Sequence, residues 1–330
     1  MKCSDPKLCY TAKSGRRYLR HFSKASLIIK KMHQEVFDCG SCFHCRKKNA
    51  REIAMKCVLE SSLYDESCFV TCTYDEKRPG YHNRYQREDI QKFKKSLRRH
   101  VEYRNPGRRI KVFDVHEYGK NKKKHWHLIV MGFDFKDKKL FKTKNGNRLY
   151  TSKALEKIWK HGFSTIGDVT EASAMYQAQY TQKDVKNKSK GEYKSKSVHS
   201  GLGRDYFLKN FRQLMLLGYV PFNNRKEPFP RYFEKIAERH YCYFYDQSAF
   251  HDLVDRKAKF RPFKKDEPIR ELADLWPLYK ERKKQFIEEI AKQWKEVMDQ
   301  HIKSQEEPDF VKSGVNSLYD LENKVEKYYF

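Results

Sequence analysis

The sequence contains no apolar run long enough to span a bilayer, and residues 1–22 have no apolar core of the kind that a signal peptide needs. It is also poor in acidic residues, because 43 Asp and Glu stand against 71 Lys and Arg, for a net charge of +28. This excess is larger than solubility requires and indicates a polyanionic partner, nucleic acid first. We therefore expect a soluble, unexported protein that binds nucleic acid and no membrane.

The sequence also lacks the even cysteine set of a disulfide framework. Its nine cysteines are odd in number and crowded toward the N-terminus, which favours thiols or metal ligands in a reducing compartment. Three of them have the short spacing of zinc ligands: Cys39, Cys42 and Cys45. They could hold a structural Zn²⁺, with Cys3, Cys9 or His44 as the fourth ligand. The alternative is a group of free thiols.

Hydrophobic periodicity predicts the elements of a central domain. The predicted helices cover 45–63, 88–103, 152–159 and 171–185, and the predicted strands cover 69–73, 110–117, 125–131 and 163–169. The order from residue 68 to 169 is β-α-β-β-α-β, the split βαβ order of ferredoxin-like domains. The expected fold class is therefore α+β, an antiparallel sheet with helices on a face.

Composition divides the rest of the chain. We predict a cysteine-rich segment over 1–45, the central domain over 46–190, a basic extension that contacts DNA over 191–264, and a charged helical region over 265–330. In the last region, a helix is expected from Pro277 onward, with Phe286, Ile290, Trp294 and Val297 on one stripe.

Two histidines flank one residue in a predicted strand, as His125-Trp126-His127. Because strand side chains alternate between faces, the histidines project to one side and Trp126 to the other. Glu117 lies on the preceding strand of an expected hairpin, so it completes a His₂-carboxylate site suited to Mg²⁺ or Mn²⁺. His116 is an alternative ligand, but only one of these neighbours can face the pair, and we favour Glu117. The competing interpretation is a pair of structural histidines.

Two tyrosines share one face of the predicted helix 171–185. Tyr176 and Tyr180 are spaced i and i+4, and Lys183 continues the face. Such spacing alone is typical of an aromatic core stripe next to a solvated lysine. Beside a metal, the same residues predict phosphoryl transfer, because an ammonium favours the phenolate and a cation polarises the phosphate.

These motifs carry a resemblance to a known family. The stretches Phe69–Asp75, His125–His127 and Tyr176–Lys183 look like the three motifs of the two-tyrosine HUH endonucleases that initiate rolling-circle replication. More closely, the chain resembles the replication initiation proteins of microviruses, especially the gokushovirus branch that includes chlamydia phages. Further matching stretches are Cys39–Arg46, His116–Gly119, Gly132–Phe135, Asn147–Ser152 and Gly162–Val169.

The resemblance implies a metal-dependent DNA endonuclease and strand transferase with an HUH fold. Such proteins nick the viral-strand origin of the replicative form, stay joined to the 5′ phosphate through tyrosine, and later close the displaced strand into a circle. Carried onto this chain, it makes Tyr176 and Tyr180 the nucleophiles, with Lys183 assisting them, and the His₂-carboxylate group the metal site. The implied partners are phage origin DNA, single-stranded or supercoiled double-stranded, and a host helicase, polymerase and single-strand-binding protein in the bacterial cytoplasm.

Some basic residues are predicted to contact phosphates: Lys122, Lys123, Lys124, Lys186, Lys188 and Arg204. Two other interpretations stay open. One is a non-enzymatic, zinc-bearing nucleic-acid-binding regulator whose histidines and tyrosines belong to the core. The other keeps the chemistry in a plasmid initiator or a transposase.

Overall fold

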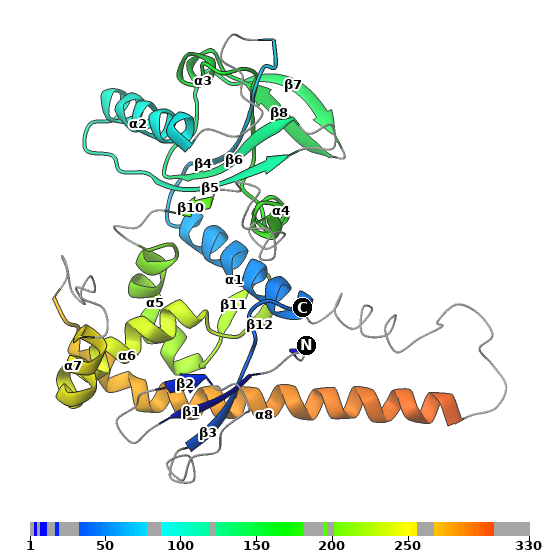
Figure 1. Ribbon diagram of the computed structural model, residues 1–330, viewed down its shortest axis with the longest axis vertical. Coiled ribbons are helices and arrows are strands. Elements are labelled where there is room, and N and C mark those ends of the chain that lie inside the picture. The colour runs from blue at the N-terminus through cyan, green and yellow to red at the C-terminus, as the bar shows by residue number, and fades with distance from the viewer. Residues whose placement is uncertain are drawn as a thin grey trace. The chain divides into compact units, whose positions relative to one another are not determined.

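The computed structural model describes residues 3–4, 7–11, 17–19, 33–77, 87–118, 123–144, 146–180, 194–196, 201–255 and 267–306. The chain divides into two compact units, Met1–Lys209 and Asn210–Phe330 (Figure 1). The boundary falls inside helix α5 (Arg204–Leu217), within the segment 191–264 that the sequence predicts as a separate extension. The four-part division of the chain stays a prediction.

An antiparallel sheet of seven strands lies at the centre of the first unit, in the order β10-β5-β6-β4-β9-β8-β7. Its strands are β4 (Ser67–Thr73), β5 (Lys111–Tyr118), β6 (Lys124–Met131), β7 (Lys139–Lys144), β8 (Asn147–Thr151), β9 (Ser164–Gly167) and β10 (Lys194–Lys196). Four of them, β4, β5, β6 and β9, correspond to the predicted strands. The predicted α+β fold with an antiparallel sheet is therefore confirmed.

The β7–β8 hairpin is an addition that the sequence analysis did not predict. It stands between β6 and α3 (Lys153–Ile158), where the expected order has no strand. Half of the β7 residues are lysines, so this strand shows no clear apolar alternation. Lysine is common on exposed edge strands because it discourages pairing with another chain.

Helices cover both faces of the sheet, rather than one face (Figure 1). Helix α2 (Arg87–Arg104) and α3 pack on one face, where α2 contributes the predicted stripe Ile90, Phe93, Leu97 and Val101. Helix α1 (Phe43–Ser61) and α4 (Glu171–Tyr180) pack on the other face. There, Ala50 and Ala54 of α1 join Ala174 and Ala178 of α4 in one core cluster, and these small side chains let the helices approach closely.

The register of the sheet lines up residues from neighbouring strands on the α1/α4 face. Glu117 of β5 pairs with His125 of β6, which pairs with Thr73 of β4. The amide of Thr73 donates to the carbonyl of Phe163, just before β9, at 2.8 Å. Trp126 has the intervening position on β6 and is fully buried in the core on the α2 face. The period of two thus separates the polar row from the core.

A small antiparallel sheet near the N-terminus has the order β2-β1-β3. Its strands are β1 (Lys7–Thr11), β2 (Arg17–Leu19) and β3 (His33–Phe37). The sequence analysis expected irregular structure here, because these short, polar stretches carry little apolar alternation.

The second unit is mainly helical. It contains the β11–β12 hairpin (Val220–Phe222 and Arg225–Glu227) and helices α6 (Arg231–Tyr245), α7 (Gln247–Asp255) and α8 (Arg270–Glu306). The hairpin turns through Asn223 and Asn224, whose φ angles of 48° and 60° suit a type I′ turn. Among the helices that the structure describes, none combines the length and the apolar character needed to cross a membrane.

Helix α8 begins at Arg270, earlier than the predicted start at Pro277, and the proline lies inside the helix. Proline removes one backbone hydrogen bond and usually marks a helix start. Here buried residues on both sides of the proline hold the helix, among them Leu272 and Tyr279, with Tyr279 donating a hydrogen bond to Glu234 at 2.6 Å.

Candidate active site and a four-cysteine group

The two histidines of the predicted metal site lie on β6 with their rings side by side. The ring centroids of His125 and His127 are 6.4 Å apart, and the ring planes differ by 28°. The hydroxyl of Thr73 lies 2.9 Å from Nδ1 of His125, and that of Thr71 lies 3.2 Å from Nδ1 of His127. When Nδ1–H donates to a threonine hydroxyl, the Nε2 lone pair is free to bind a cation.

Glu117 belongs to the same group. Its Oε2 atom lies 3.0 Å from Nε2 of His127, and its backbone pairs with that of His125 across the β5–β6 hairpin. Burial, reinforced by the neighbouring His127, lowers the pKa of His125, which favours the neutral imidazole that metals bind. Two imidazoles and one carboxylate fit a hard or borderline divalent cation.

His116, the alternative ligand, lies on the opposite face of β5. Its ring makes edge contacts with Tyr118 at 4.7 Å and with Trp126 at 5.1 Å between centroids. Burial lowers the pKa of His116 to about 3, so the ring is neutral inside the core. The strand therefore directs His116 away from the pair and Glu117 toward it.

Tyr176 reaches this group from α4. Its hydroxyl donates to Oε2 of Glu117 at 3.3 Å, and its ring centroid lies 5.4 Å from that of His127 in an edge contact. The side chain is 44% exposed, so solvent and ligands can reach it. The tyrosine, the acid and the histidine thus come together from three elements of the first unit.

Gln177, the next residue of α4, fixes the position of this helix. Its side chain is fully buried, and Nε2 donates to the carbonyl of Phe113 at 2.7 Å and to that of His127 at 3.1 Å. One side chain therefore ties α4 to both β5 and β6. The sequence analysis missed this residue, as it missed Thr71 and Thr73, because isolated polar residues usually face solvent.

Several predicted site residues have no described side chain. Tyr180 ends α4, but its side chain lies outside the described residues, as do Lys183, Lys122, Lys186 and Lys188. Lys123 is exposed. Lys124 is buried, with Nζ 4.4 Å from the ring centroid of Tyr74, so it faces the core and is not offered to DNA. Arg204 is partly buried, 3.7 Å from the carboxylate of Asp205.

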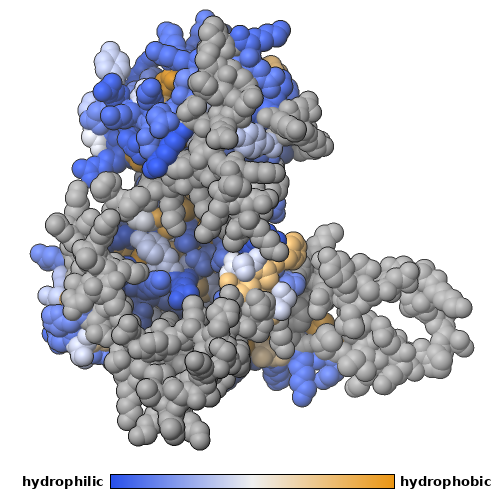
Figure 2. All heavy atoms as spheres, viewed as in Figure 1, coloured by the Kyte–Doolittle hydropathy of each residue, from blue (hydrophilic) through white to orange (hydrophobic). Residues whose placement is uncertain are grey.

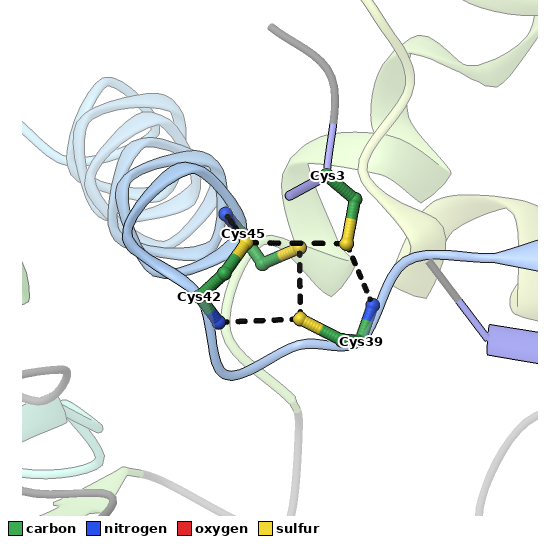
Figure 3. Close-up of side chains that lie close together, drawn as sticks. All are labelled: Cys3, Cys39, Cys42 and Cys45. Atoms are coloured by element: carbon green, nitrogen blue, oxygen red, sulfur yellow. Dashed lines mark hydrogen bonds between the residues drawn. The ribbon is translucent and has the colours of Figure 1, made fainter. Parts of the chain in front are cut away.

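A second group of possible metal ligands lies at the start of α1 (Figure 3). The Sγ atoms of Cys3, Cys39, Cys42 and Cys45 all lie within 4.8 Å of one another. Cys3 thus joins the three cysteines whose spacing predicts a zinc site. Of the other two predicted fourth ligands, the side chain of Cys9 is outside the described residues, and His44 is not part of the group. This group could hold a metal ion.

Backbone amides point at the sulfurs of this group. The amides of Cys39, Cys42 and Cys45 donate to Sγ of Cys3, Cys39 and Cys42 at 3.2, 3.2 and 3.4 Å. The bond from the Cys45 amide, at the first turn of α1, is the main cause that lowers the pKa of Cys42 to about 5. Thiolate is the form that binds metals.

Comparison with known proteins places the chain in a family. The family described as replication-associated protein ORF2 matches residues 67–185, which contain the histidine pair, Glu117 and Tyr176. The replication-associated protein VP4 of Bdellovibrio phage phiMH2K is 31% identical over 221 residues, 63% of this chain and 69% of that protein. The chain belongs to the microvirus-type replication-associated proteins.

Two further members of this family are similar. The replication-associated protein ORF4 of Chlamydia phage 1 is 30% identical over 214 residues, 61% of this chain, and this match spans only about half, 53%, of the phage protein. The replication-associated protein ORF2 of Spiroplasma virus 4 is 29% identical over 264 residues, 72% of this chain and 81% of that protein. No solved structure matches the chain.

Proposed function

We propose that this chain initiates replication of a small phage genome by cutting one DNA strand and joining the cut end to a tyrosine. The observation that carries the proposal is the meeting of Tyr176, Glu117 and His127, with contacts of 3.3 and 3.0 Å. A nucleophile and the ligands of a cation are the two parts that phosphoryl transfer to tyrosine requires. The net charge of +28 and the family membership support DNA as the substrate.

In the proposed reaction, the hydroxyl oxygen of Tyr176 attacks the phosphorus of one phosphodiester bond. The new O–P bond joins the 5′ phosphate to the tyrosine, and the P–O3′ bond breaks to leave a free 3′ hydroxyl. The phenolic proton has to leave, and Glu117 already accepts a hydrogen bond from this hydroxyl. The phosphodiester energy is kept in the phosphotyrosine link, so a later 3′ hydroxyl can reverse the step and close a circle.

His125, His127 and Glu117 would hold Mg²⁺ or Mn²⁺. Such a cation, when bound, polarises the scissile phosphate and neutralises its developing charge. The threonine hydroxyls of β4 hold the imidazoles in the required orientation. Tyr180 is proposed as the second nucleophile and Lys183 as the residue that assists the phenolate. The proposed partners are origin DNA and the replication proteins of a bacterial host.

The decisive experiment traps the covalent product. Protein, Mn²⁺ and single-stranded DNA from the genome that encodes the chain are mixed, and a denaturing gel is searched for protein-linked DNA. Mass spectrometry then identifies the residue that carries the nucleotide. We expect Tyr176→Phe combined with Tyr180→Phe to abolish the adduct and to leave DNA binding largely intact. Tyr103→Phe, at an exposed tyrosine of α2, is the control.

The same experiment separates the enzyme from a non-enzymatic regulator. A regulator would bind with a steep salt dependence and form no adduct with any metal. Undiminished adduct formation by the double tyrosine variant would refute the proposed nucleophiles.

We also propose that the four-cysteine group binds a structural Zn²⁺, with Cys3 as the fourth ligand. In a tetrahedral site with Zn–S bonds of about 2.3 Å, sulfurs stand about 3.8 Å apart. The Sγ atoms of Cys39 and Cys45 are 3.9 Å apart, as are those of Cys3 and Cys42. The site would tie Cys3 to the first turn of α1, more than thirty positions along the chain.

Zinc content and cobalt spectra test this site. We expect about one zinc per chain, and Co²⁺ in its place should give the charge-transfer and visible bands of a tetrahedral thiolate site. Cys3→Ser should weaken metal binding at least tenfold, whereas Cys242→Ser, at a buried cysteine of the second unit, should not. A chain that binds neither metal through sulfur, or that holds iron and sulfide, would contradict the proposal.

A further inference from the structure

Two phenylalanines lie half exposed against each other in the first unit. Phe163 precedes β9 and is 46% exposed, and Phe141 of β7 is 49% exposed. Their ring centroids are 5.2 Å apart, with an angle of 58° between the planes. In the view of Figure 2, the described surface is mainly hydrophilic, with a few hydrophobic areas. Neighbouring exposed apolar side chains on such a surface often mark a binding site.

The sheet register places Phe163 at the end of the row that carries the candidate active site. Thr73 pairs with His125 on one side and donates its amide to the carbonyl of Phe163 on the other, at 2.8 Å. Residues opposite each other on neighbouring strands share a face, and neighbouring strands lie about 4.8 Å apart, so Phe163 begins about 10 Å from His125. This separation is on the scale of one or two nucleotides.

The backbone under Phe163 is held firmly. Gly162 has a φ of +155°, and a Cβ atom there would lie 2.3 Å from the carbonyl oxygen of Thr73. The indole of Trp159, which is buried, donates to the same carbonyl at 3.1 Å. The exposed ring is therefore presented by fixed structure, which reduces the entropy that ordering a ligand on it would cost.

The charges around the two rings match a nucleic acid. Nζ of Lys142 lies 5.4 Å from the ring centroid of Phe141. Lys139 and Arg148 are also exposed on the β7–β8 hairpin. Aromatic side chains among basic groups are typical of surfaces that bind single strands, because bases stack on the rings while cations meet the phosphates. A purely apolar partner would leave these cations without a role.

We infer that Phe141 and Phe163 form a stacking platform for bases of single-stranded DNA next to the cleavage site. The inference rests on the proposed function for the choice of DNA, and it adds the surface that positions the strand. Each stacked base contributes enough affinity that its loss weakens binding roughly 5- to 100-fold.

Photocrosslinking of the unaltered protein tests the platform directly. A single-stranded oligonucleotide with 5-iododeoxyuridine is irradiated with the protein in EDTA, so that no cleavage takes place, and crosslinked peptides are sequenced by mass spectrometry. We expect crosslinks at Phe141 or Phe163. Crosslinks confined to other residues would overturn the inference.

Binding of an oligo-dT strand, measured by fluorescence anisotropy in EDTA, is the second test. Phe163→Ala and Phe163→Leu should both weaken binding, and Phe163→Trp should retain it, because leucine keeps the apolar bulk but lacks a π-face. Leu140→Ala is the matched control, since Leu140 is the neighbour of Phe141 on β7 and is 61% exposed. A Phe163→Leu variant that binds like the unaltered protein would overturn the stacking role.

These tests are independent of the proposed nucleophiles. If the adduct forms on Tyr176 while the phenylalanine variants bind normally, only the platform is wrong. If the platform binds DNA but no adduct forms, only the enzymatic proposal is wrong.

Discussion

Gln177→Leu tests whether one buried amide positions the tyrosine helix. The side chain is fully buried and donates to two backbone carbonyls, one on β5 and one on β6, at 2.7 and 3.1 Å. Leucine has a similar volume and no donor, so both bonds are lost and the cavity stays filled. The neighbouring Tyr176 then depends on apolar packing of α4 alone.

The expected magnitude follows from the two hydrogen bonds. Each contributes about 0.5–1.5 kcal/mol net, so the free energy of unfolding of the first unit should fall by about 1–3 kcal/mol. The effect on chemistry should be larger, because a shift of about 1 Å in a reacting group can lower a rate on the order of 100-fold. We therefore expect the rate of adduct formation to fall by more than the loss of stability would produce.

Two measurements check this expectation. Urea unfolding with hydrogen exchange of the α4 amides reports local stability, and single-turnover adduct formation reports the position of Tyr176. Gln179→Leu is the control, because Gln179 is an exposed glutamine of the same helix and should change stability by less than about 0.5 kcal/mol. If Gln177→Leu matches this control in both measurements, the amide does not position the helix.

Three further predictions concern other parts of the chain. Gly162→Ala should lower the free energy of unfolding by about 3 kcal/mol or more in a thermal melt, because its Cβ would collide with the Thr73 carbonyl; a smaller loss would mean that the backbone yields. Thr73→Val should weaken Mn²⁺ binding tenfold or more in calorimetry, because Nδ1 of His125 loses its partner; unchanged affinity would contradict this. Burial, with Glu234 in the same direction, raises the pKa of Tyr279, so its stabilisation is full below pH 10 and is lost as pH rises further. Tyr279→Phe should make the alkaline loss of stability shallower, and an equally steep loss would count against that role.

The central domain was predictable because its buried elements have regular periods. The stripe of α2 and the alternation of His125, Trp126 and His127 each specify one face, so the positions of the histidines followed from the sequence alone. The short hairpin also made the proximity of Glu117 predictable, since it needs no long-range contact.

The remaining features depend on contacts between distant residues. Cys3 could not be chosen over Cys9 or His44 from spacing, because the fold alone brings it to the first turn of α1. Gln177 is buried because two strand carbonyls face it, which no local pattern records. The β7–β8 hairpin escaped prediction because its lysine-rich edge strand obscures the period of two.

The β5–β6 hairpin has a consequence for the order in which the protein is made. Glu117 and His125 are close in sequence, so bringing them together costs little loop-closure entropy. Tyr176 is translated later and has to dock with α4 on a sheet that already exists. A nascent chain therefore passes through a stage that can hold a cation but has no positioned nucleophile, which keeps an unfinished initiator from breaking the DNA of its host.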